Sequence, residues 1–135
     1  DKRKTFYRIF KALNELEHGA LMIISSDAQE SAMRLCSKYN RGTEVYIELE
    51  KDENIELLKK IASVDGAVMV GIDAICYGFG VILDGEARIK GERARGARYN
   101  SACNYIAGKN ECAIIISEDK ERGIEIKDGL KLQVI

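Results

Sequence analysis

Apolar and polar residues follow two spacings along this chain, and the two alternate. Residues 2–17 carry apolar side chains at spacings of three and four, which predicts an amphipathic helix. The run ALMII at 20–24 is continuously apolar but too short for a buried helix, so it predicts a central strand. Residues 44–49, EVYIEL, alternate polar and apolar side chains, which is typical of a half-exposed strand.

The same patterns divide the rest of the chain. Helices are predicted over 2–17, from Ser26 to about 39, over about 53–62 and over 98–108. Strands are predicted over 20–24, 44–49, 67–70, 75–83, 112–116, 123–126 and 132–135.

Capping and turn residues predict where these elements begin and end. Gly19 is expected to end the first helix, Ser26 with Gln29 to form a capping box, and Asp52 to cap the third helix. The two glycines in 75–83 predict a bulge or a close backbone approach. Asp-Gly pairs at 84–85 and 128–129 predict turns, the first leading into a return strand at 87–89.

Strands alternate with helices for about two-thirds of the chain, and a β-rich tail follows. This order predicts the α/β class, with a mixed central sheet flanked by helices. The sequence contains no internal repeat, low-complexity segment or linker. We therefore expect residues 1–135 to form a single domain.

Composition excludes several classes of protein. The formal net charge of −1 provides no overall field for nucleic acid or an anionic membrane, and no apolar run reaches membrane-spanning length. The four cysteines form no CxxC pair and the chain has one histidine, so we expect no structural zinc and a reducing, cytoplasmic location. Because the first residue is not Met, we expect a domain from a longer chain that carries further domains.

An arginine-rich segment, residues 91–104, leads into the last predicted helix. Arg93, Arg95 and Arg98 supply forked donors, and the first N–H groups of the helix can donate as well. The segment fits a polyphosphate site, and it fits a solvated basic turn equally well.

Carboxylates stand where predicted strands meet loops. Asp65 precedes the strand at 67–70, while Glu118 and Asp119 follow the strand at 112–116. An acid at a strand end can hold a divalent cation beside phosphate. Asp65 also fits a plain Asp-Gly turn, and the Glu118 pair fits a solvated loop. No GxGxxG or P-loop motif is present.

The order of four motifs resembles the diadenylate cyclase family. The motifs, which lie within about residues 15–128, are Asp65-Gly66-Ala67 as the family's DGA, the HGALMI stretch at 18–23, Gly96-Ala97-Arg98-Tyr99-Asn100-Ser101-Ala102 in place of GTRHRAA, and Ile115-Ile116-Ser117-Glu118-Asp119 in place of VVSEE.

The resemblance implies a domain that binds ATP with Mg²⁺ or Mn²⁺ and acts as a face-to-face homo-oligomer, joining two ATP molecules into cyclic di-AMP. It makes Asp65 a metal ligand that also helps draw the proton from the attacking ribose 3′-hydroxyl. Gly66 and Ala67 would shape the nucleotide pocket. Arg98 would hold the triphosphate, and Ser117 and Glu118 would line the phosphate and metal side, Glu118 as a second metal ligand.

The chain departs from the family at the RHR triplet, which reads Arg98-Tyr99-Asn100 here, followed by Ser101. Asn100 can donate to a phosphate but carries no charge, and Tyr99 can stack or hydrogen-bond but cannot become cationic. Three functions therefore stay open: an active diadenylate cyclase, a nucleotide-binding sensor or effector domain on the same fold, and a pairing module without a ligand.

Overall fold

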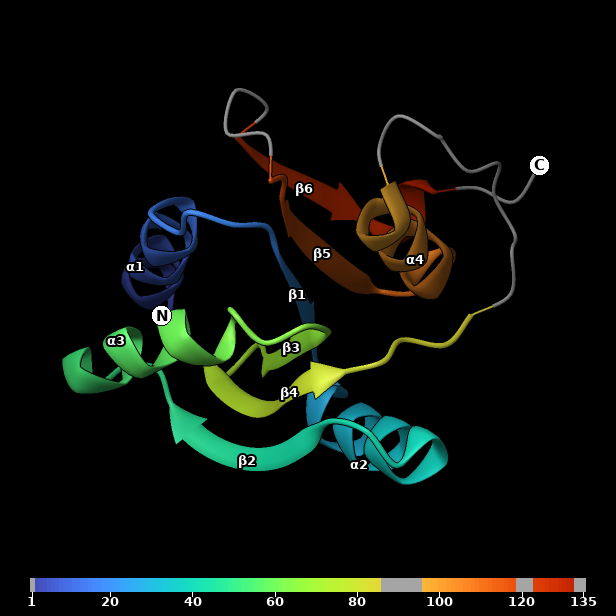
Figure 1. Ribbon diagram of the computed structural model, residues 1–135, viewed down its shortest axis with the longest axis horizontal. Coiled ribbons are helices and arrows are strands. Elements are labelled where there is room, and N and C mark those ends of the chain that lie inside the picture. Colours follow the sequence, from blue (N-terminus) through green and yellow to red (C-terminus); the bar gives the residue numbers. More distant parts are fainter. Residues whose placement is uncertain (1, 86–95, 119–122, 133–135) are drawn as a thin grey trace.

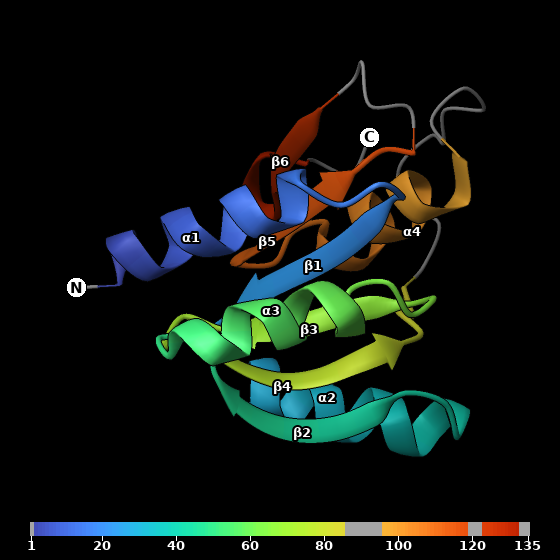
Figure 2. The ribbon, with the colours of Figure 1, turned by 60° about the vertical axis from the view of Figure 1, so that its left-hand side comes forward.

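The computed structural model describes residues 2–85, 96–118 and 123–132. Their centre is a six-stranded sheet with the strand order β2-β4-β3-β1-β5-β6 (Figure 2). The strands are β1 (Ala20–Ser25), β2 (Thr43–Glu48), β3 (Ala67–Gly71), β4 (Ile75–Val81), β5 (Glu111–Ile116) and β6 (Ile124–Asp128). β1 and β3 are parallel and the other neighbouring pairs are antiparallel, which confirms the predicted mixed sheet.

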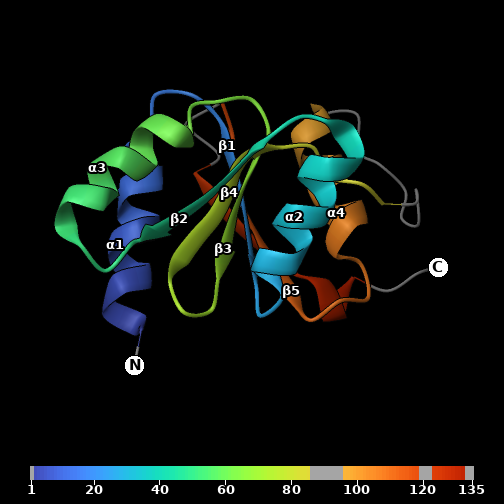
Figure 3. The same ribbon diagram turned by 90° about the horizontal axis from the view of Figure 1, so that it is seen from below.

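Four helices cover the two faces of this sheet (Figures 1 and 3). They are α1 (Arg3–Asn14), α2 (Ala28–Tyr39), α3 (Asp52–Ile61) and α4 (Gly96–Ile106). α1 and α3 lie on one face, and α2 and α4 lie on the other (Figure 3). No helix in the described part of the chain is long and apolar enough to cross a membrane.

The alternation of side chains along the strands supplies one hydrophobic cluster to each face. Met22, Val68 and Ile114 pack with α1 and α3 in the first cluster. Ile23 and Met69, the next residues along β1 and β3, pack with α2 and α4 in the second. Because both faces are covered, β1 and β3 read as continuous apolar runs in the sequence.

Several predicted element boundaries are wrong by one to a few residues. α1 ends at Asn14 rather than at Gly19. The N-cap of α2 is Asp27, so Ser26 forms no capping box, and the N-cap of α3 is Lys51, which makes Asp52 its first helical residue. β4 ends at Val81, two residues before the predicted end of its strand.

The end of the chain also differs from the prediction. Asp128 leads into a 3-10 helix, Gly129–Lys131, instead of a turn between two strands. The Asp128 side chain accepts a hydrogen bond from the Leu130 backbone N–H, which favours this local turn. Leu132 lies in a bend, and 133–135 are outside the described residues, as are the predicted return strand at 87–89, Arg93, Arg95 and Asp119.

Asp84 links the segment after β4 to helix α2. Its carboxylate accepts hydrogen bonds from Arg34 at 2.7 and 3.2 Å and from Lys38 at 2.9 Å. The Arg34 guanidinium, with a smaller contribution from Lys38, holds the pKa of the Asp84 carboxyl well below its usual range. These ion pairs hold the segment that follows β4 against α2.

The four cysteines, which lie on helices and strands of the sheet, are free thiols. Cys76 and Cys103 are buried, whereas Cys36 and Cys112 are only partly buried. Burial raises the pKa of the Cys76 thiol to about 12, so it stays protonated at neutral pH.

Candidate functional site

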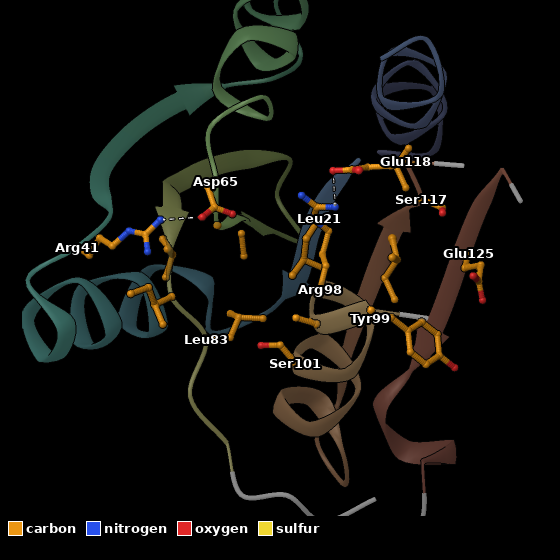
Figure 4. A pocket seen from close by; sticks show the side chains of 18 residues that line it. Leu21, Arg41, Asp65, Leu83, Arg98, Tyr99, Ser101, Ser117, Glu118 and Glu125 are labelled. Atoms are coloured by element: carbon orange, nitrogen blue, oxygen red, sulfur yellow. Dashed lines mark hydrogen bonds and ion pairs between the residues drawn. The ribbon is translucent and has the colours of Figure 1, made fainter. Parts of the chain in front are cut away.

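A pocket of about 600 Å³ opens at one end of the sheet (Figure 4). The parallel strands β1 and β3 begin at this end, and the antiparallel strands β4 and β5 finish there. The first turn of α4 closes one side. The pocket is lined by Leu21, Arg41, Asp65, Gly66, Ala67, Val81, Ile82, Leu83, Gly96, Ala97, Arg98, Tyr99, Ser101, Ile115, Ile116, Ser117, Glu118 and Glu125.

Residues far apart in the sequence meet here because of the strand register. Leu21 of β1 is opposite Ala67 in β3 and opposite Ile115 in β5. Asp65 stands two residues before Ala67, and Glu118 stands three residues after Ile115. The mixed pairing thus brings the amino end of β3 and the carboxyl end of β5 to the same end of the sheet. Of the predicted site residues that the structure describes, all except Asn100 line the pocket.

Asp65 lies at the rim, 83% exposed, and pairs with an arginine from another element. Arg41 Nη2 donates to Asp65 Oδ2 at 3.1 Å. Arg41 follows Asn40, which ends α2 in the left-handed conformation with φ 48°. Asp65 is therefore more than a plain turn residue, because it carries an ion pair between the loop that follows α2 and the turn that precedes β3.

Gly66 fixes the position of Asp65 through backbone packing. Its φ of 117° strains any residue with a Cβ, and a Cβ there would overlap Gly80, standing 2.8 Å from the Gly80 Cα. Gly80 itself has a φ of 63°. The pairing of β3 with β4 shifts register beside this contact, between Ala67 and Met69 on β3 and their partners Val81 and Gly78 on β4. The glycines of 75–83 therefore mark both a bulge and a close approach, as predicted.

Arg98 comes from the first turn of α4, which contains no acidic residue. Its side chain is 33% exposed, and its Nη1 lies 4.0 Å from Oε1 of Glu118, which is 75% exposed. The guanidinium occupies the space where Gly19 has no Cβ. Arg98 and Glu118 lie together on the side of the pocket opposite Arg41 and Asp65 (Figure 4). A helix N-terminus beside an arginine is a suitable anion site.

The three residues after Arg98 take different positions. Tyr99 is only 9% exposed and belongs to the hydrophobic cluster under α2 and α4, with Lys127 Nζ 5.5 Å from its ring centre. Its ring points away from Asp65, toward Glu125 (Figure 4). Ser101 is exposed on the lining, and Asn100 is not among the lining residues. Of the altered triplet, Arg98 alone presents a charge to the pocket.

The oxygen ligands in this pocket fit Mg²⁺ or Mn²⁺ only when a ligand shares the metal. Asp65 and Glu118 both line the pocket, and carboxylates are preferred ligands of these hard cations. No group of three or more His, Cys, Asp or Glu side chains that could hold an ion occurs among the described residues. Mg²⁺ usually takes one or two carboxylates and keeps its other positions for water and substrate phosphates, and Asp65 and Glu118, on opposite sides of the pocket, could each supply one such carboxylate.

Two charged lining residues escaped the sequence analysis. Arg41 directly follows the second predicted helix, and an arginine before a glycine has no motif of its own. Glu125 stands within β6, where alternation predicts a strand position and nothing more. Both become visible only once the sheet order brings α2 and β6 to the pocket.

Comparison with known proteins identifies the fold and the family. The family model described as DisA bacterial checkpoint controller nucleotide-binding, DAC, matches residues 8–129. The chain belongs to this family. A search of curated proteins found no match.

Two solved structures show the same fold. DacA from Staphylococcus aureus, crystallised as a double mutant, has a TM-score of 0.71 and 19% identity, and covers 97% of this chain and 85% of its own. A protein titled a hypothetical membrane spanning protein from Bacillus cereus has a TM-score of 0.69 and 19% identity. That match covers 96% of this chain, which spans 61% of the Bacillus chain. The chain is therefore a diadenylate cyclase-like nucleotide-binding domain.

Proposed function

We propose that the nucleotide bound by this domain is ATP, and that two copies condense two ATP molecules into cyclic di-AMP. One observation carries the proposal: Asp65, Arg98 and Glu118 line the same pocket although they belong to three distant parts of the sequence. This set combines carboxylates for a divalent cation with a cation for phosphate.

The pocket supports distinct roles for its charged and apolar parts. Arg98 and the N-terminal N–H groups of α4 would bind the phosphates, with Ser101 and Ser117 as hydroxyl donors. Leu21, Leu83 and Ile115 supply apolar surface suited to a purine ring.

In the reaction, each ribose 3′-oxygen would bond to the α-phosphorus of the other ATP, and pyrophosphate would leave. Asp65 and Glu118, one on each side of the pocket, would each offer a carboxylate to Mg²⁺ or Mn²⁺, which supplies neutralisation of phosphate charge when bound. Asp65 would also help draw the proton from the 3′-hydroxyl. The chemistry asks mainly for positioning and charge neutralisation, which this pocket offers. Two domains must face each other, so the proposal includes a homo-oligomer, within a longer cytoplasmic protein.

A second candidate is a sensor or effector domain that binds a nucleotide without joining two. The specific observation in its favour is the altered triplet: Tyr99 is packed in the core, and Asn100 is not among the lining residues. This leaves one cation where the family has two arginines and a histidine. Losing a charge-assisted contact costs about 1.5–3 kcal/mol, and it would impair the chemical step more than binding where that contact is stronger in the transition state.

One experiment separates the candidates. The purified domain is incubated with ATP and Mn²⁺, and cyclic di-AMP is quantified, with Asp65→Asn as the control. Product from the wild type that is lost in the variant supports the cyclase. No product together with a thermal shift by ATP, GTP or cyclic di-AMP supports the sensor. No product and no shift with any of them leaves the pairing module.

A further inference from the structure

Each arginine that lines the pocket is paired with one of the two carboxylates proposed to hold metal. Arg41 donates to Asp65 at 3.1 Å, and Arg98 lies 4.0 Å from Glu118. Figure 4 shows the two pairs on opposite sides of the pocket. The arginines thus neutralise the carboxylates in the absence of any cation.

This arrangement conflicts with a cation at Asp65. A divalent ion on that carboxylate would stand within a few ångströms of the Arg41 guanidinium, and the repulsion would weaken or break the ion pair. Arg41 then needs another anion. The phosphates of a nucleotide that shares the metal are the anions nearest to hand, and a guanidinium fork matches their oxygens.

Arg41 is placed to make such an exchange. Its backbone is fixed between Asn40, at φ 48°, and Gly42, at φ 104°, where a Cβ would stand 3.1 Å from the Val81 Cα. Its side chain, in contrast, is 51% exposed and bonded to a partner that is 83% exposed. A fixed base with a long, solvated side chain can change partners at little cost in structure.

From these contacts we infer that Arg41 is a phosphate-binding and positioning residue that moves from Asp65 to the nucleotide when metal and nucleotide bind together. This inference rests on the proposed function of the same pocket. It has a thermodynamic consequence. Metal alone must displace Arg41 without compensation, and nucleotide alone must take it from an uncompensated Asp65, so the two ligands bind with positive cooperativity.

The test uses Arg41→Gln, with Lys38→Gln as the matched control. Lys38 lies on the last turn of α2, pairs with Asp84 and is not among the lining residues. Affinities are measured by calorimetry for Mn²⁺ alone, ATP in EDTA, and ATP with Mn²⁺. Arg41→Gln should bind Mn²⁺ alone about two- to fivefold tighter, the range of an exposed ion pair, and ATP with Mn²⁺ about tenfold more weakly. Lys38→Gln should change neither affinity.

Opposite signs in one variant distinguish the exchange from damage to the fold, which lowers both affinities together. A wild type that binds ATP with Mn²⁺, beside an Arg41→Gln protein with both affinities unchanged or both reduced, overturns the inference and leaves the proposed function standing. A wild type that binds no ATP with Mn²⁺ overturns both.

Discussion

The guanidinium of Arg98 lies against the backbone of Gly19, in the space that a Cβ at position 19 would fill. Gly19→Ala should therefore displace Arg98 and weaken binding of ATP with Mn²⁺ by about five- to tenfold, since a charge-assisted contact is lost in part. The added Cβ would also stand 2.9 Å from the carbonyl oxygen of Ile116, so stability should fall by about 1 kcal/mol. Calorimetric titration and urea unfolding measure the two effects.

A double-mutant cycle isolates the part that passes through the arginine. In an Arg98→Ala background, Gly19→Ala should cause no further loss of affinity, because the displaced group is gone. An equal loss in both backgrounds would show that the Ile116 contact, and not Arg98, is responsible.

Arg98→Ala should itself weaken binding of ATP with Mn²⁺ at least tenfold, because the phosphates lose a partly buried cation. Arg98→Lys keeps the charge but loses the fork, so it should retain part of the affinity. Lys60→Ala, an exposed charge on α3 on the other face of the sheet, is the control for net charge. If Arg98→Ala bound ATP as the wild type does, the phosphates would lie elsewhere.

Gly66→Ala should reduce the free energy of unfolding by about 2–4 kcal/mol, since backbone strain and an overlap with Gly80 add together. Gly123→Ala is a matched control, because Gly123 has a φ of 66° but no atom within 4 Å of the added Cβ. It should cost about 1 kcal/mol, from strain alone. Urea unfolding of both variants gives the comparison; equal losses would remove the role assigned to the Gly66–Gly80 contact.

Asp84→Asn should make the free energy of unfolding less dependent on pH in the acidic range. The folded-state pKa of Asp84 is depressed by Arg34, so its contribution is present above the unfolded pKa of about 3.9 and lost as pH falls toward the lower folded value. Because both partners are about half exposed, we expect a loss of about 1–2 kcal/mol at pH 7. The difference between variant and wild type should shrink below about pH 4 in urea unfolding. A difference that stays constant from pH 7 to pH 3 would contradict the ion pair.

The sequence predicted the elements of the sheet well, because burial leaves a local pattern. β1 and β3 are continuous apolar runs and were found within one residue of their ends. The boundaries predicted at Ser26 and Asp52 differ by one residue from the N-caps Asp27 and Lys51, and neither N-cap makes the side-chain hydrogen bond on which the prediction relied. Leu132 follows an Asp-Gly pair that forms a local 3-10 turn, which an apolar run alone does not reveal.

The candidate site was predicted where a motif spans neighbouring residues, and missed where only the fold joins them. Asp65 and Glu118 were found through their motifs and share one pocket. Arg41 was not found, because its link to Asp65 joins residues 24 positions apart across the sheet edge. Tyr99 is predicted to contact the nucleotide, and its burial shows that it fills the core, which its position in the motif does not reveal.

Leu21 is the register partner of both Ala67 and Ile115, so a single residue of β1 sets the positions of β3 and β5, which flank it, along the strand direction at the pocket. The carboxylates of Asp65 and Glu118 are consequently carried by strands about two strand spacings apart, roughly 10 Å, with β1 between them. The segment at 15–19 joins β1 to α1. A substitution that shifts β1 along its own direction would therefore change its register with β3 and β5 together, and would reach the two halves of the charged site at once.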